Sequence, residues 1–154
     1  MGPASVIDWS QRPTYSKEQL GRYFDRVSLP DKYREHPVVK IAVAGASRQG
    51  LSTADALDFL RVLQRHHLAA VPFENLNLHY STHRALSIDP QNLFEKIVSS
   101  TSQRGGYCME NNTLLGGILR TLGYSVTSVG GRVNEAAQPI SASKNWRGPK
   151  YDGW

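Results

Sequence analysis

Four segments of the chain carry apolar side chains three and four residues apart, which places them on one face of an α-helix. Ser16, Ser52 and Asp89 precede the first three segments and are typical N-cap residues. The fourth segment begins at Cys108 and stops before Gly123, a residue that commonly ends helices. The pattern predicts helices within residues 15–27, 52–69, 89–100 and 108–122.

The last part of the chain differs from these helical segments. Residues 124–134, YSVTSVGGRVN, have the composition of a β-strand, and the residues that follow are interrupted by proline and glycine. A single strand has no partner for its backbone hydrogen bonds, so the chain looks unfinished. The sequence predicts an α+β protein in which residues 1–123 form a helical domain and residues 124–154 begin a second, incomplete domain.

Composition excludes several classes of protein. Hydrophobic residues make up 40% of the 154 and charged residues 20%, which is typical of a globular chain. No apolar run reaches the roughly 20 residues of a membrane helix, and the start lacks the features of a signal peptide, so we expect a cytoplasmic protein without a membrane partner. The net charge is +5, but the basic residues are scattered along the sequence, which argues against a nucleic-acid-binding protein. A positive net charge also suits a small anionic ligand.

The single cysteine lies in the segment QRGGYCMENN, residues 103–112. Gly105 and Gly106 allow a tight turn into the fourth helix, where Cys108 faces unpaired backbone amides and the positive end of the helix dipole. Such a position stabilises a thiolate. We interpret Arg104 as a structural ion-pair partner of a nearby carboxylate, for which Glu74 and Glu110 are both candidates. The alternative is that Cys108 is a small buried apolar residue.

A thiolate nucleophile needs a base, which is normally a histidine. All five histidines precede the cysteine, and none lies in a segment typical of a catalytic base. His66 and His67 are adjacent and point about 100° apart on a helix, so they do not hold one metal ion together. With one cysteine and no other ligand cluster, we expect no metal site.

Two motifs connect these observations to a known family. VPFENL at residues 71–76 is followed about thirty residues later by RGGYCMEN at residues 104–111, and this pair resembles the arylamine N-acetyltransferases. The resemblance covers most of residues 15–133, and within the family the sequence is most similar to fungal members.

The resemblance implies a helical bundle that carries the cysteine, then a β-barrel and an α/β lid, an architecture shared with cysteine proteases and transglutaminases. It implies that Cys108 takes an acyl group from acetyl-CoA or malonyl-CoA as a thioester. The acyl group then passes to an arylamine, aminophenol or hydrazine, with no permanently bound cofactor, in the detoxification of foreign compounds. Glu74 and Arg104 match a family ion pair that supports the cysteine loop together with Gly105 and Gly106.

The family's catalytic histidine and aspartate lie downstream of the cysteine, beyond a segment like YDGW, where this sequence stops at Trp154. We therefore expect a truncated chain with little activity alone. Apolar faces that meet the barrel in the family would be exposed, which favours self-association or aggregation.

Three alternatives remain open at this point. The chain is a truncated, non-catalytic product of such a gene, or it is a cysteine hydrolase or transglutaminase-like protein, which shares the geometry of a cysteine at a helix start. The third alternative rests on residues 38–50, VVKIAVAGASRQG, which read as a strand and a glycine loop of a nucleotide-binding turn.

Overall fold

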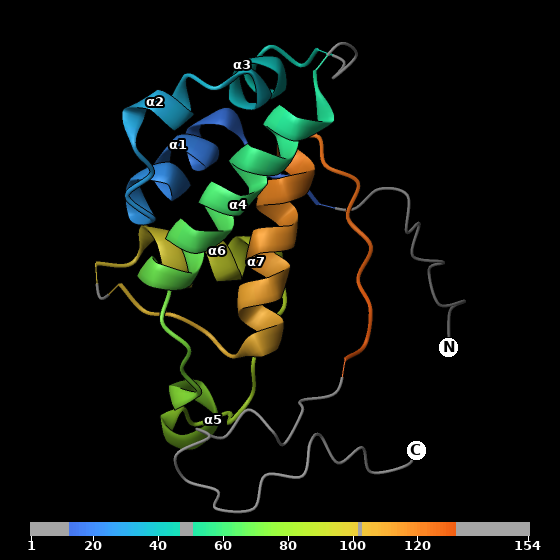
Figure 1. The fold of residues 1–154 in the computed structure, drawn as a ribbon. Coiled ribbons are helices and arrows are strands. Elements are labelled where there is room, and N and C mark those ends of the chain that lie inside the picture. Colours follow the sequence, from blue (N-terminus) through green and yellow to red (C-terminus); the bar gives the residue numbers. More distant parts are fainter. Residues whose placement is uncertain (1–12, 47–50, 102, 132–154) are drawn as a thin grey trace, which may run out of the picture.

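A computed structural model describes residues 13–46, 51–101 and 103–131, and this part of the chain is helical. Figure 1 shows α4 and α7 as the two long helices, with α2 and α3 at one end of the molecule and α5 at the other. No strand occurs within the described ranges. The elements are α1 (Lys17–Arg26), α2 (Asp31–Arg34), α3 (Pro37–Val43), α4 (Thr53–Ala70), α5 (Leu76–Tyr80), α6 (Pro90–Phe94), the π-helical turn η1 (Glu95–Ser99) and α7 (Cys108–Thr121).

The predicted helix starts are confirmed by their side-chain caps. Ser16 accepts a hydrogen bond from the Gln19 amide, and the Gln19 side chain accepts one from the Ser16 amide, which together form a capping box. The Ser52 hydroxyl accepts from the amide of Asp55. The Asp89 carboxylate accepts hydrogen bonds from the amides of Gln91 and Asn92 in the first turn of α6, which have no acceptor within the helix. Each cap satisfies donors that would otherwise have no partner in the helix.

The fourth helix also begins and ends where the sequence predicts. It starts at Cys108, and Gly123 follows it with a φ of +80°, a left-handed conformation that only glycine adopts without strain. The third helix differs in one respect, because its last turn, η1, widens to the π-helical form.

The apolar run that starts at residue 38 does not form the strand of a nucleotide-binding turn, because residues 37–43 are the helix α3. Pro37 occupies the first turn of α3, and the ring of His36 accepts a hydrogen bond from the amide of Val38. Val38 and Val39 are buried on one face of this helix. The nucleotide-binding alternative is therefore excluded, since its strand is a helix; residues 47–50 of the glycine loop lie outside the described residues.

The strand expected over residues 124–134 is not formed in the portion that the structure describes. Residues 125–131 are irregular, because a strand needs a neighbouring segment to pair with and none lies beside them in the described ranges. Residues 132–154, which include most of the predicted second domain, lie outside the described residues. The barrel itself stays a prediction.

One hydrophobic core joins the helices. Phe59 and Leu63 of α4 and Leu114 and Ile118 of α7 are fully buried in it. Helix α6, which continues directly into η1, packs on α7, and α1 packs on η1. Further buried members come from α1, α3 and the third helical segment: Leu20, Tyr23, Phe24, Val38, Val39, Leu93, Phe94 and Ile97. The apolar periodicity of the sequence therefore identifies the buried faces of the first, third and fourth helical segments. In α4 it does not, because Leu57 is exposed and the buried face consists of Phe59, Leu63 and His67.

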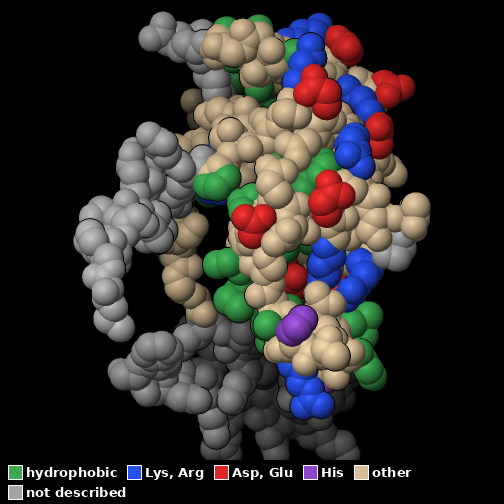
Figure 2. All heavy atoms as spheres, turned by 180° about the vertical axis from the view of Figure 1, so that it is seen from behind, with side chains coloured by type: hydrophobic (Ala, Val, Ile, Leu, Met, Phe, Trp, Pro, Cys, Tyr) green, Lys and Arg blue, Asp and Glu red, His purple; other side chains and the backbone are tan. Residues whose placement is uncertain are grey.

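The surface of the described part mixes charge signs and retains apolar side chains. On the face shown in Figure 2, basic and acidic side chains lie largely among one another. Large exposed apolar side chains include Val43, Leu57, Leu68, Phe73, Leu76, Tyr80, Ile88, Met109 and Val129. Self-association through such side chains stays a prediction. Among the described helices, none has the length and apolar character needed to cross a membrane.

Two neighbouring glycines of α7 provide a test of the packing. A Cβ at Gly117 would lie 2.6 Å from the ring of Tyr15, whereas one at Gly116 would meet nothing closer than the end of the Arg120 side chain, at 3.5 Å. We expect Gly117→Ala to lower the free energy of unfolding by about 1 to 3 kcal/mol through overpacking. Gly116→Ala is the matched control and should be neutral or raise it by up to about 1 kcal/mol through helix propensity. Urea unfolding of both variants measures this, and equal effects would contradict the packing.

Stability should also depend on the buried pair of Tyr23 and His67, whose hydroxyl and Nδ1 atoms are 3.0 Å apart. Burial, with a contribution from Arg26, lowers the pKa of His67 from 6.5 to about 4. The unfolded chain therefore takes up this proton first as the pH falls, so stability present above pH 6.5 is lost below it. We expect a loss of about 1 to 2 kcal/mol between about pH 6.5 and pH 5.

The matched variants are His67→Gln, which keeps a hydrogen-bonding group beside Tyr23 but does not titrate, and His83→Gln at an exposed position. Unfolding free energies measured across this pH range should change less in His67→Gln than in His83→Gln. Parallel pH dependence in the two variants would contradict the assignment to His67.

Candidate active site

The loop before α7 pairs with the loop after α4. The Gly106 amide donates to the Pro72 carbonyl at 3.2 Å, and the Glu74 amide donates to the Gly106 carbonyl at 3.1 Å, which forms an isolated parallel bridge. A Cβ at Gly105 would lie 1.7 Å from the Pro72 carbonyl oxygen. Only glycine fits at this approach, so the two motifs that the sequence singled out, 71–76 and 104–111, are held against each other.

Cys108 is the first residue of α7, as predicted. Tyr107 before it has extended backbone angles and occupies the N-cap position, and the cysteine is exposed. Amides of the first helical turn have no acceptor within the helix, and the helix dipole is positive at this end. The arrangement corrects the alternative reading of Cys108 as a buried apolar residue, because the side chain is accessible to a substrate.

Four charged side chains form a connected group behind the loop. Arg104 Nη2 lies 2.8 Å from Glu74 Oε1, so its partner is the one of the two candidate carboxylates that the family resemblance implies. Lys96 Nζ lies 3.3 Å from the same Glu74 oxygen and 2.8 Å from Glu110 Oε1. Two carboxylates thus face two cations, and Glu110 pairs with Lys96 rather than with Arg104.

Both carboxylates of this group also accept backbone amides. Glu74 Oε2 accepts from the Leu76 amide at 2.6 Å, and Glu110 Oε2 accepts from the Tyr107 amide at 2.9 Å. Burial raises the pKa of Glu74, but the Leu76 amide and the nearby Lys96 and Arg104 outweigh this, so its pKa lies below the usual value. Glu74 is therefore a carboxylate at neutral pH.

Arg26 of α1 holds three segments together beneath the cysteine loop. Its guanidinium donates to the carbonyls of Ile97 at 2.9 Å, Ala70 at 2.7 Å and Gln103 at 3.0 Å. Gln103 has a φ of +46°, a left-handed conformation that is unusual for a residue with a side chain. The bond to Arg26 therefore supports the loop where its backbone turns.

Sequence reasoning missed both Lys96 and Arg26. Lys96 and Arg26 both lie in helical segments that were predicted from their apolar positions alone. The charged residues of these segments did not enter that prediction. Neither residue has a neighbour in the sequence that reveals its partners. The available signals were the stretches YFDRV and LFEKIV, which contain Arg26 and Lys96 and lie within the family resemblance.

Three histidines have structural contacts elsewhere. The ring of His36 accepts from the start of α3, His66 Nδ1 lies 3.1 Å from the Val27 carbonyl oxygen, and His67 contacts Tyr23. These contacts are structural, and none of the three histidines was expected to be a catalytic base. Within the described residues, no group of three or more His, Cys, Asp or Glu side chains is arranged to hold a metal ion.

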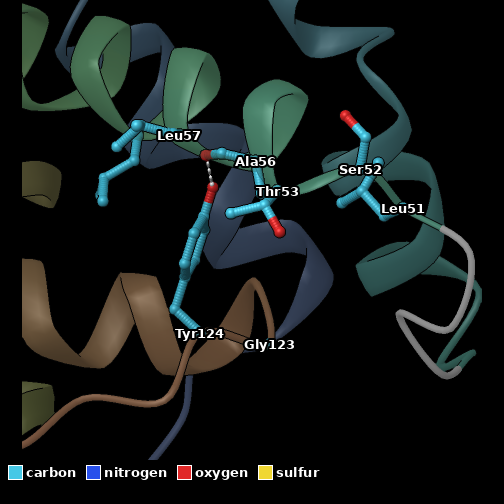
Figure 3. A pocket seen from close by; sticks show the side chains of 8 residues that line it. Leu51, Ser52, Thr53, Ala56, Leu57, Gly123 and Tyr124 are labelled. Carbon is cyan, nitrogen blue, oxygen red and sulfur yellow. Dashed lines mark hydrogen bonds between the residues drawn. The ribbon is translucent and has the colours of Figure 1, made fainter.

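A pocket of about 490 Å³ lies at the other end of α7 from the cysteine. Figure 3 shows Tyr124 reaching across it, with its hydroxyl donating to the Ala56 carbonyl at 2.6 Å. Leu51, Leu57 and Gly123 also line this pocket. The 14 residues of α7 span about 20 Å, so the pocket is too far from Cys108 to hold a substrate of its thiol.

Comparison with known proteins gives matches over the same region. The N-acetyltransferase family matches residues 56–145, more than half of the chain. N-malonyltransferase FDB2 of Fusarium pseudograminearum is 42% identical over 142 residues, which cover 92% of this chain. N-malonyltransferase FDB2 of Gibberella moniliformis is 38% identical over 149 residues, or 96% of this chain. An arylamine N-acetyltransferase of Gallus gallus, the pineal gland isozyme NAT-3, is 46% identical over 77 residues, or 50% of this chain and 25% of its own length.

These relatives are considerably longer than the chain. The matched segments cover 39% of the Fusarium protein and 41% of the Gibberella protein. The comparison therefore concerns the part of those proteins that aligns with the helical region and the cysteine motif.

The close approach at Gly105 generates a test of the loop pairing. Gly105→Ala places a methyl group 1.7 Å from the Pro72 carbonyl oxygen, which is a steric clash. The two loops must therefore separate, and Cys108 must move with its loop. We expect the rate of Cys108 alkylation by iodoacetamide to change at least about fivefold, because thiol reactivity follows its local environment. The control is Gly21→Ala in α1, where an added Cβ meets nothing within 4 Å. An unchanged rate in Gly105→Ala would show that the loops do not approach as described.

Proposed function

The chain belongs to the arylamine N-acetyltransferase family, and from this premise we propose that Cys108 is the nucleophile of an N-acyltransferase. In the first step the thiolate attacks the carbonyl carbon of an acyl-CoA, the bond to the CoA sulfur breaks, and CoA leaves as a thiolate that takes up a proton. In the second step an arylamine, aminophenol or hydrazine attacks the cysteine thioester and releases Cys108. The acyl-CoA is a substrate, and no cofactor stays bound.

The observation that carries this proposal is the position of Cys108. It is exposed at the first turn of α7, directly after the loop at residues 103–107. This loop is held by the bridge to residues 72–74 and by the charged group of Glu74, Lys96, Arg104 and Glu110. A helix N-terminus favours negative charge on a side chain at this position. Glu74, Arg104, Gly105 and Gly106 thus act by supporting the loop, and Cys108 is the residue that reacts.

For the acyl donor, we propose malonyl-CoA. The two fungal relatives that cover nearly all of the chain carry the name N-malonyltransferase, whereas the relative from chicken, which is named an acetyltransferase, aligns over half of it. The chain's net charge of +5 suits a donor with an additional carboxylate. Acetyl-CoA is the competing donor. We place the reaction in the cytoplasm, where it would modify foreign aromatic amines.

The base for this chemistry is expected from outside the described residues. The 154-residue sequence contains no histidine after Cys108, and the family resemblance places the catalytic histidine and aspartate downstream of the cysteine. General acid–base catalysis typically contributes about 10² to 10⁴ in rate. We therefore propose that this chain accepts an acyl group on Cys108 but passes it to an amine slowly unless those residues are supplied.

The test is to incubate the protein with malonyl-CoA or acetyl-CoA and measure its intact mass. We expect one acyl adduct, faster with malonyl-CoA, which is absent in Cys108→Ser because a serine hydroxyl at this position has no thiolate form. The adduct should be removed by an added arylamine with formation of the N-acylated amine. Ser125→Ala, at an exposed position after α7, is the control and should react like the unmodified protein.

Other outcomes separate the alternatives. An adduct that hydrolyses at the same rate with and without amine would favour a cysteine hydrolase or transglutaminase-like protein. No adduct with either donor, although Cys108 reacts with iodoacetamide, would favour a non-catalytic product. An adduct that persists in Cys108→Ser would show that the acyl group lies elsewhere.

A further inference from the structure

Lys96 and Glu110 lie between the Glu74–Arg104 pair and the first turn of α7. The side chain of Glu110 is 1% exposed, and those of Lys96 and Glu74 are each 13% exposed. Lys96 Nζ lies within ion-pair distance of both carboxylates, closer to Glu110 at 2.8 Å than to Glu74 at 3.3 Å. Since Arg104 already pairs with Glu74, Lys96 is the one cation that contacts Glu110 among the described ion pairs.

The carboxylate of Glu110 connects this cation to the cysteine loop. One of its oxygens pairs with Lys96, and the other accepts the amide of Tyr107, the residue immediately before Cys108. The fit beneath the loop is close, because a Cβ at Gly106 would lie 2.8 Å from Glu110 Cβ and 3.2 Å from Oε2. A single hydrogen bond therefore links this carboxylate to the backbone next to Cys108, so that a shift of the carboxylate also shifts Cys108.

A buried carboxylate is costly without a partner. Removing one member of a buried ion pair leaves an uncompensated charge, which is either neutralised or drawn out toward water. In this site Lys96 and Arg104 balance Glu74 and Glu110, so loss of the lysine leaves the most buried of the four charges without a counterion. Removing the charge of Glu110 as well would eliminate that cost.

We propose that Lys96 and Glu110 are positioning residues for Cys108: the ammonium of Lys96 holds the Glu110 carboxylate in place, and that carboxylate fixes the Tyr107 amide and the first turn of α7. The inference rests on the role of Cys108 proposed above. The proposal gives a role to two residues, in addition to Gly105, Gly106, Cys108 and the Glu74–Arg104 pair, which already have one. Neither residue touches the substrate in this account.

The test compares Lys96→Met, Glu110→Gln and the double variant. Methionine keeps most of the length of the lysine side chain without its charge, and glutamine keeps an acceptor for the Tyr107 amide. Cys108 is the sole cysteine, so its alkylation by iodoacetamide reports on one site. Thermal unfolding and the rate of adduct formation with malonyl-CoA are measured on the same samples.

We expect Lys96→Met to slow alkylation and acyl transfer to Cys108 roughly tenfold, since small displacements of a reacting group have effects of at least this size. Glu110→Gln should slow both reactions less than Lys96→Met does, because glutamine keeps an acceptor for the Tyr107 amide but carries no charge, and the double variant should recover to the rate of Glu110→Gln. This recovery distinguishes a counterion from a residue that only fills space, because a space-filling lysine would be missed equally in both backgrounds.

If Lys96→Met alone does not fold, the comparison moves to the Glu110→Gln background, where adding Lys96→Met should have little further effect. A double variant as slow as Lys96→Met, or a Lys96→Met variant indistinguishable from the unmodified protein, would overturn the proposal. Unmodified protein that is alkylated normally but forms no adduct with malonyl-CoA or acetyl-CoA would instead contradict the proposed function. The alkylation series would still decide the positioning role.

Discussion

The pairing of the loop at residues 72–74 with the loop at residues 104–106 determines where Cys108 lies. Two backbone hydrogen bonds make this pairing, and the carboxylate of Glu74 reinforces it by binding Arg104 and Lys96 at once. The backbones come close enough that a side chain at Gly105 would collide with Pro72. Helix α7 begins directly after this contact, so its exposed first residue is held at a fixed place relative to α4 and η1.

The ion pairs of this site differ from those on the surface. Exposed ion pairs such as Arg34 with Asp25 contribute little, because water and salt screen them. Lys96, Glu74 and Glu110 are largely removed from water, where unpaired charge is expensive and the arrangement has few alternatives. The value of the buried group lies in this restriction: it orients the loop at the start of α7.

The four longer helical segments were predictable because their signals are local. Ser16, Ser52 and Asp89 cap the helices that they precede, and Gly123 ends the last one, as their backbone preferences indicate. Residues 37–43 were harder, since a short apolar run fits a strand or a buried helix, and only Pro37 in the first turn favours the helix. The strand expected after Gly123 failed over residues 125–131 because strand formation depends on a partner segment, which local composition does not specify.

By itself, the sequence determined the boundaries of the four longer helical segments, the start of α7 at Cys108 and, through the motifs around residues 71–76 and 104–111, the family. These properties depend on residues close together in the chain or on a recognisable order of letters. Only the tertiary structure decided that Cys108 is exposed, that Lys96 pairs with Glu110 and that Arg26 binds carbonyls of three separate segments. The partners of Lys96 and Arg26 lie 14 to 77 residues away in the sequence, and which groups meet is fixed by how the helices pack and not by the residues that flank them.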